Sequence, residues 1–196
     1  MPTPDSDLHM AVITLFDGGV VNNASIAARL AQLILEPLIG ASELAANLPL
    51  RIEDHGDNWA IRGGRMASGS GTPRTCDLDI RKLDAAVLIS GDRPAQDLLG
   101  DPALAEKFAA AVLESTNGEE ELRQQSPLIV SDQGETWRAR GSRGADRTVE
   151  GPGPFHLEVQ KRDARVLDMW FEWVLHTPPD VQALLRASAK RPPSEG

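Results

Sequence analysis

The sequence of 196 residues predicts an α+β fold in which two tandem repeats each contain a helix followed by a four-stranded antiparallel meander. The first observation is a duplicated motif, because residues 127–141 repeat the pattern of residues 49–63 at a distance of 78 positions. The second is helical periodicity before each copy, and the third is strand periodicity within and after it. Because a missed duplication leads to the wrong fold, this one guides the interpretation of every other segment.

The duplication extends beyond the motif in both directions. Upstream, residues 26–50 match residues 104–128 without a gap, with nine identical pairs that include Ala27 and Ala105. Downstream, the register slips by one residue, and residues 79–88 match residues 158–167. We therefore predict five segments: an N-terminal arm with a short strand (1–21), repeat 1 (22–91), repeat 2 (101–176), a C-terminal helix (178–190) and a disordered tail (191–196).

Start and stop signals bound the helix of repeat 1. Asn22 and Asn23 offer an N-cap, and apolar residues follow at helical spacing. Pro37 lacks a backbone donor, so the helix is expected to kink or to end nearby, with Gly40 as its stop. A short helical turn is expected next, over residues 42–46.

The helix of repeat 2 has a clearer start. Asp101 is a good N-cap, and Pro102 occupies the first helical position, where its missing N–H costs nothing. Gly118 is expected to close this helix. The acidic run at residues 119–121 then predicts a solvated loop, with contact to a basic partner as the alternative.

Period-two alternation predicts four strands after each helix. In repeat 1, residues 50–53 and 58–62 form a hairpin, and residues 76–81 form a third strand with one apolar and one polar face. A turn at residues 83–85 leads into the fourth strand. The last strand of repeat 2 is longer, because residues 169–175 extend it.

Six duplicated residues are expected to stabilise the fold. A Trp at an inward position of a strand belongs to the core, where its burial contributes roughly 4–6 kcal/mol as an upper bound. Gly supplies the positive φ of a hairpin turn, and Asp bonds to the backbone there. The six residues are Trp59 and Trp137, Gly56 and Gly134, and Asp54 and Asp132.

Composition and charge limit the possible partners and compartments. A chain that is 41% apolar and 25% charged is typical of soluble globular proteins, and a net charge of −9 disfavours nucleic acid and favours a basic protein partner. A repeat of about 75 residues is marginal alone, so the halves are expected to share an interface. The single Cys76, with no signal peptide or membrane span in the sequence, predicts a cytoplasmic protein.

Residues that could carry catalysis do not form a recognisable pattern. The four histidines, His9, His55, His156 and His176, are scattered and none is duplicated. The sequence shows no metal-ligand spacing, phosphate loop or nucleophile elbow, and Cys76 is expected to be a small buried apolar residue. We therefore expect a protein that is not an enzyme and that uses no metal and no cofactor.

One combination of motifs resembles a known family. It comprises Ala27 and Ala31, the helix end at residues 36–40, the pattern Asp54-x-Gly56-Asp57-x-Trp59-x-Ile61-x-Gly63, and Ile80-x-Lys82-x-Asp84-x-x-Val87-Leu88. Over residues 22–90 and 101–168, the chain resembles the bacterial immunity proteins of nuclear transport factor 2 fold. The resemblance implies a cystatin-like α+β fold, here in tandem, and a cytoplasmic function of binding and neutralising a cognate toxin.

Two other functions remain open at this stage. Many relatives of this fold are enzymes or small-molecule binders that use a cone-shaped cavity. A cavity lined by paired acid and His side chains would favour that function, whereas a filled core with a charged open sheet face would favour the inhibitor. A tandem inhibitor of a secreted enzyme would require a signal peptide, which the sequence does not show.

The open faces of the sheets are the predicted binding surface, because polar strand residues must point away from the core. Trp170 is of special interest since exposed Trp is enriched at interface hot spots, although the C-terminal helix could instead cover it. The expected partner is a toxin with a basic surface, and the oligomeric state is open. The candidate residues are Arg51, Glu53, Arg62, Asp77, Asp79 and Arg81 in repeat 1, and Arg138, Arg140, His156, Glu158, Gln160, Trp170, Glu172 and His176 in repeat 2.

Overall fold

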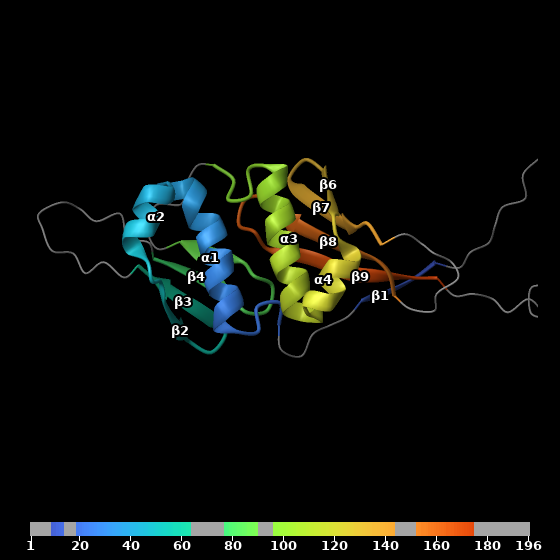
Figure 1. Ribbon diagram of the computed structural model, residues 1–196, viewed down its shortest axis with the longest axis horizontal. Coiled ribbons are helices and arrows are strands. Elements are labelled where there is room, and N and C mark those ends of the chain that lie inside the picture. The colour runs from blue at the N-terminus through green and yellow to red at the C-terminus, as the bar shows by residue number, and fades with distance from the viewer. Residues whose placement is uncertain (1–8, 14–18, 64–76, 90–95, 144–151, 175–196) are drawn as a thin grey trace, which may run out of the picture.

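The computed structural model describes residues 9–13, 19–63, 77–89, 96–143 and 152–174 (Figure 1). These residues form helices and antiparallel sheets, which confirms the predicted α+β class. Each half has a long helix and a short one: α1 (Ala24–Ile39) and α2 (Ala41–Asn47) in the first, α3 (Pro102–Asn117) and α4 (Glu119–Gln125) in the second.

The strands form two sheets. The first contains, in spatial order, β2 (Arg51–Asp54), β3 (Asn58–Arg62), β4 (Leu78–Arg81) and β5 (Val87–Ile89). The second contains β1 (His9–Ile13), β9 (Val166–Val174), β8 (Pro152–Gln160), β7 (Thr136–Gly141) and β6 (Leu128–Asp132). The second sheet has one strand more than expected, because the extended strand β9 offers an edge on which β1 pairs antiparallel, with Ile13 opposite Trp170.

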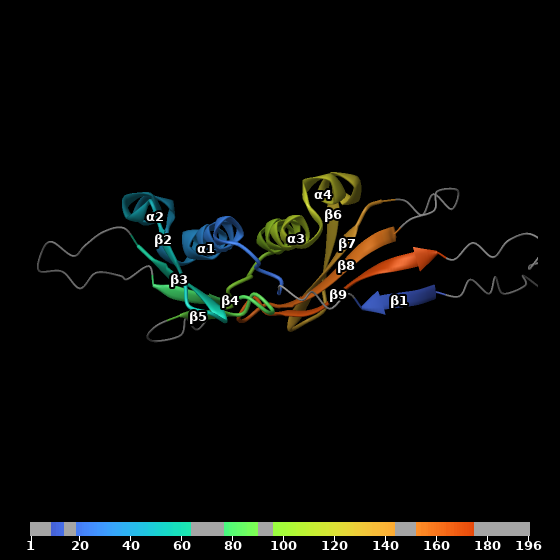
Figure 2. The ribbon, with the colours of Figure 1, turned by 90° about the horizontal axis from the view of Figure 1, so that it is seen from below.

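The helices and the sheets form two layers. Figure 2 shows the helices on one side and most of both sheets on the other. The long helices α1 and α3 lie side by side in the middle, whereas α2 and α4 lie toward the outside. Among the described residues, each sheet therefore has helices on one face only, and we call the opposite face, which points away from the helical layer, its open face.

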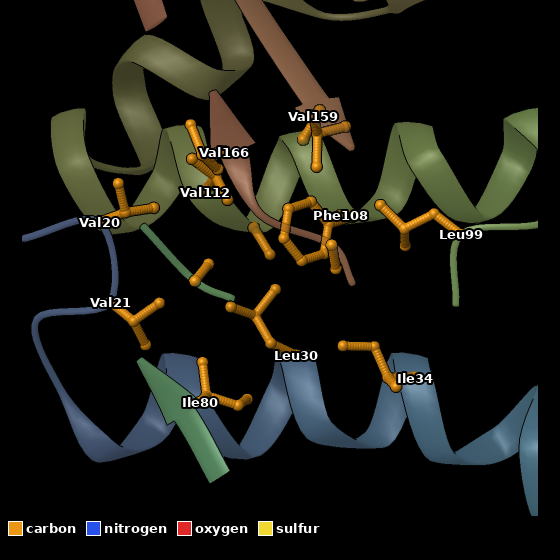
Figure 3. Close-up of a cluster of buried hydrophobic side chains, with 14 of the residues drawn as sticks. Val20, Val21, Leu30, Ile34, Ile80, Leu99, Phe108, Val112, Val159 and Val166 are labelled. Carbon is orange, nitrogen blue, oxygen red and sulfur yellow. The ribbon is translucent and has the colours of Figure 1, made fainter. Parts of the chain in front are cut away.

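A single hydrophobic core joins the two halves, as the small size of each half leads us to expect. Leu30 and Ile34 of α1 point toward Phe108 of α3 (Figure 3), and all three side chains are fully buried. Val112 of α3 and Ile80 of β4 belong to the same cluster. Each half on its own would therefore expose some of these side chains to water.

The halves also exchange backbone hydrogen bonds at equivalent positions. Val87 donates its N–H to the carbonyl of Asp163 at 2.9 Å, and Val166 donates to the carbonyl of Asp84 at 2.8 Å. Val87 and Val166 are equivalent in the duplicated register, as are Asp84 and Asp163. The two turns before the last strands therefore meet in a locally two-fold arrangement.

The helix ends follow local chemistry. The side chain of Asn23 accepts the N–H of Ile26 at 3.0 Å, and that of Asp101 accepts the N–H of Leu104 at 2.9 Å. Pro37 lies in the last turn of α1, and the helix ends two residues later, at Ile39. The prediction of a solvated loop at residues 119–121 is wrong, because these residues form the first turn of α4. Carboxylates at the start of a helix interact favourably with the helix dipole.

Gln125 at the end of α4 holds the second sheet to the helical layer. Its fully buried side chain donates to the carbonyl of Gly153 at 3.1 Å and accepts the N–H of Phe155 at 3.0 Å. Gly141 leaves room for the Gln125 side chain, because a Cβ at position 141 would lie 1.9 Å from Gln125 Oε1. The equivalent residue of the first half, Asn47, bonds to Glu43 within its own helix.

This difference predicts the effect of two matched substitutions. Gln125→Ala leaves buried backbone groups of β8 without partners and should lower the free energy of unfolding by about 3 kcal/mol, whereas Asn47→Ala should cost about 1 kcal/mol. Urea denaturation of both variants measures the difference. Equal losses would show that Gln125 contributes no more than a local helix-end bond.

Candidate functional site

The two duplicated tryptophans lie between helix and sheet. In the first half, Trp59 is buried, and its indole N–H donates to the carbonyl of Val21 at 2.9 Å. The ammonium of Lys82 lies 4.4 Å from the centre of the indole ring and bonds to Asp54 at 2.6 Å. The Asp54 side chain also accepts the N–H of Gly56, whose φ is 76°. The carbonyl of Val21 and the ammonium of Lys82 thus both hold the indole in place.

The second half repeats this arrangement. Trp137 donates to the carbonyl of Leu99 at 2.7 Å, and Lys161 lies 4.1 Å above its ring and bonds to Asp132 at 2.6 Å. The lysine and the Gly134 N–H hold the pKa of Asp132 below its usual value. Sequence reasoning missed both lysines as partners of the rings, although their equivalent positions were visible as Lys82 and Lys161 in the duplicated register. In each half, the lysine therefore connects the indole to the hairpin turn, which stabilises the fold.

The predicted residues of the first sheet's open face are largely paired with one another. Arg62 bonds to Asp79 at 2.9 Å across neighbouring strands, and Arg51 contacts Glu53 at 2.7 Å along β2. Arg81 instead turns to the half-buried Asp84, at 2.5 Å. Asp77 precedes β4 and is half-buried. Two ion pairs, Arg62–Asp79 and Arg51–Glu53, therefore neutralise four of the charges of this face within the chain.

The open face of the second sheet carries a row of side chains that runs across four strands. The register places Ile129 of β6 opposite Arg140 of β7, Arg140 opposite His156 of β8, and His156 opposite Trp170 of β9. The rings of His156 and Trp170 are stacked, with centroids 4.9 Å apart and planes inclined by 5°. We call Ile129, Arg140, His156 and Trp170 the cross-strand row.

Charged groups surround the cross-strand row. Glu172 of β9 lies 3.4 Å from the guanidinium of Arg140 and 3.8 Å from Nε2 of His156. Arg138 and Glu158 form a closer pair at 3.0 Å beside it. His156 Nε2 is buried, and the described part of the chain provides no hydrogen-bond partner for it.

The environment of His156 favours its neutral form. Burial lowers the pKa of His156 below its ordinary value of 6.5; the Glu172 carboxylate opposes this, and Arg140 and Arg138 add to it. The unfolded chain thus takes up the proton more readily than the folded protein. The contribution of neutral His156 to the free energy of unfolding is therefore fully present above the pKa of His156 in the unfolded chain, about 6.5. This contribution is lost as the pH falls from there toward the lower pKa of His156 in the folded protein.

This linkage gives a pH prediction. Between about pH 7.5 and about pH 5.5, the free energy of unfolding should decrease more in the wild type than in His156→Gln, which has no group to protonate there. Urea titrations of both proteins at several pH values measure the two slopes. Identical slopes would mean that His156 titrates in the folded protein as it does in the unfolded chain.

An open groove of about 360 Å³ lies on the helical layer, between the end of α1 and the start of α3. Glu36, Asp101 and Lys107 line it together with apolar residues. No histidine is among its lining residues, so this groove lacks the paired acid and His side chains that would favour the enzyme alternative.

Two of the remaining sequence candidates belong to other described elements. His55 is in the first hairpin turn, 3.4 Å from Glu53, and His9 is in β1. Cys76, His176, the C-terminal helix at 178–190 and the tail at 191–196 lie outside the described residues. Among the described residues, no group of three potential ligands could hold a metal, and none of the helices has the length and apolar character of a membrane span.

Comparisons with known protein families, with curated proteins and with solved structures find no match to the chain.

Proposed function

We propose that the chain is a cytoplasmic immunity protein, built from two cystatin-like repeats, that binds and neutralises a cognate bacterial toxin. The resemblance of the duplicated motifs to immunity proteins of nuclear transport factor 2 fold supplies the hypothesis. The observation that carries it is the combination, among the described residues, of a packed core with charged sheet faces that no described helix covers, which suits recognition of a protein better than catalysis.

The packed core of the described residues weighs against the small-molecule alternative. In each half, a buried indole belongs to this core. The indoles of Trp59 and Trp137 are each held by a backbone hydrogen bond and a lysine. A ligand that bound in place of an indole would have to displace these groups, which would cost several kcal/mol.

The charge of the chain supports a basic protein partner. With a net charge of −9, the protein attracts positively charged surfaces and accelerates their association at low salt. Neutralisation by binding requires neither a cofactor nor a metal. The proposed site is an open sheet face, and the second sheet is favoured because its candidates include an aromatic stack.

Co-expression with the product of the neighbouring gene tests this function. If that product is the cognate toxin, it should arrest growth when expressed alone, and co-expression of this protein should restore growth. The two purified proteins should also elute as one complex in size-exclusion chromatography. Continued growth arrest despite soluble, folded protein, together with separate elution, would contradict the proposal.

A further inference from the structure

The two halves of the chain differ at the cross-strand row, and this difference serves as an internal comparison. At equivalent positions, Ile129 replaces Arg51 and His156 replaces Asp77, whereas Arg140 matches Arg62. The first half thus pairs β2 with β3 while it carries Arg51 where β6 of the second half has the exposed Ile129. It also has Asp77, directly before β4, where β8 has the stacked ring of His156. The fold therefore does not require Ile129 or His156 at these positions.

The row has the composition and the rigidity of a binding surface. Ile129 is 60% exposed on the edge strand β6, so most of this apolar side chain remains accessible to a partner. The stack of His156 on Trp170 holds both rings in one orientation, so little conformational freedom remains to be lost on binding. Trp and Arg, which are both present here, are the residue types that dominate interface energetics.

The charges beside the row indicate the chemistry of the partner. Glu158 has a close partner in Arg138 at 3.0 Å and accepts a hydrogen bond from Thr136 at 3.1 Å. Glu172, by contrast, has contacts of 3.4 Å to Arg140 and 3.8 Å to His156, both longer than a strong charged hydrogen bond. An incoming guanidinium or ammonium group could approach the Glu172 carboxylate more closely than either neighbour does.

We propose that the cross-strand row and Glu172 form the docking site for a basic segment of a partner protein. An arginine or lysine of the segment binds Glu172, and an adjacent apolar side chain packs on Trp170 and Ile129. This inference rests on the proposed function as far as the partner is a protein, but it does not require that partner to be a toxin.

Peptide display on the full-length protein tests the inference. A random peptide library is selected against the wild type, and enriched peptides are measured by fluorescence anisotropy. Enriched peptides should combine Arg or Lys with a neighbouring apolar residue. Their affinity should fall at least about tenfold with Trp170→Ala and with Glu172→Gln, as expected for hot-spot contacts.

Two variants on the other side of the molecule provide matched controls. Leu48→Ala removes an exposed apolar side chain and Glu106→Gln an exposed carboxylate of the helical layer, and neither should change peptide affinity. The double variant Ile129→Arg and His156→Asp introduces residues that the first half already carries, so it should fold and still lose binding.

Three results would overturn the inference. They are a lack of enriched peptides, enrichment of acidic peptides, and binding that depends on Asp79 rather than on Glu172. The growth assay with the neighbouring gene remains separate from these results. Toxin neutralisation that survives Trp170→Ala and Glu172→Gln would reject this site and keep the function, whereas specific peptide binding without neutralisation would keep the site and reject the function.

Discussion

Trp137→Ala should lower the free energy of unfolding by about 3–5 kcal/mol, the cost typical of removing a buried large aromatic side chain. The indole is 6% exposed, donates a hydrogen bond of 2.7 Å to the carbonyl of Leu99, and carries Lys161 over its face. The substitution therefore opens a cavity, leaves one buried carbonyl without its donor and frees the lysine that holds the hairpin turn. Chemical denaturation followed by circular dichroism measures the loss.

Two further variants separate these contributions. Trp137→Phe keeps an aromatic ring under Lys161 but loses the hydrogen bond to Leu99, and should cost about 1–2 kcal/mol. Trp170→Ala removes an indole that is half-buried on the open face, and should cost about 1 kcal/mol. If Trp137→Ala destabilised no more than Trp170→Ala does, the assignment of Trp137 to the core would be refuted.

Residues 1–96 expressed alone should fail to fold cooperatively. In the whole chain, Leu30 and Ile34 are completely buried within the one core cluster that also contains Phe108, so the fragment would expose them to water. Val87 would also lose its hydrogen bond to the second half. Differential scanning calorimetry of the fragment and of the whole chain makes the comparison. A monomeric fragment that melts cooperatively at the same temperature as the whole chain would show that the halves fold independently.

Local features of the fold could be predicted from the sequence. Asn23 and Asp101 cap their helices because an N-cap depends on residues within one turn. The hairpin turns at Gly56 and Gly134 have positive φ for the same local reason. The alternation of the strands also predicted which residues point to the open faces, such as Arg140 and His156.

Features that depend on distant segments could not be predicted in this way. The pairing of β1 with β9 joins residues more than 150 positions apart, and no local pattern specifies that edge. The stack of His156 on Trp170 depends on the register of two strands, which periodicity alone does not fix. Gln125 is a polar residue whose complete burial follows from its bonds to β8, which lie some 30 positions along the chain.

The affinity of the cognate toxin for Trp170→Ala tests the central claim, that the open face of the second sheet recognises a protein. Isothermal titration calorimetry should show binding about 30-fold weaker than that of the wild type, or about 2 kcal/mol, mostly through faster dissociation. Asp79→Lys, at the first sheet, should mainly change the salt dependence of association. Wild-type affinity in Trp170→Ala, with the fold intact by circular dichroism, would place the interface elsewhere and contradict the account.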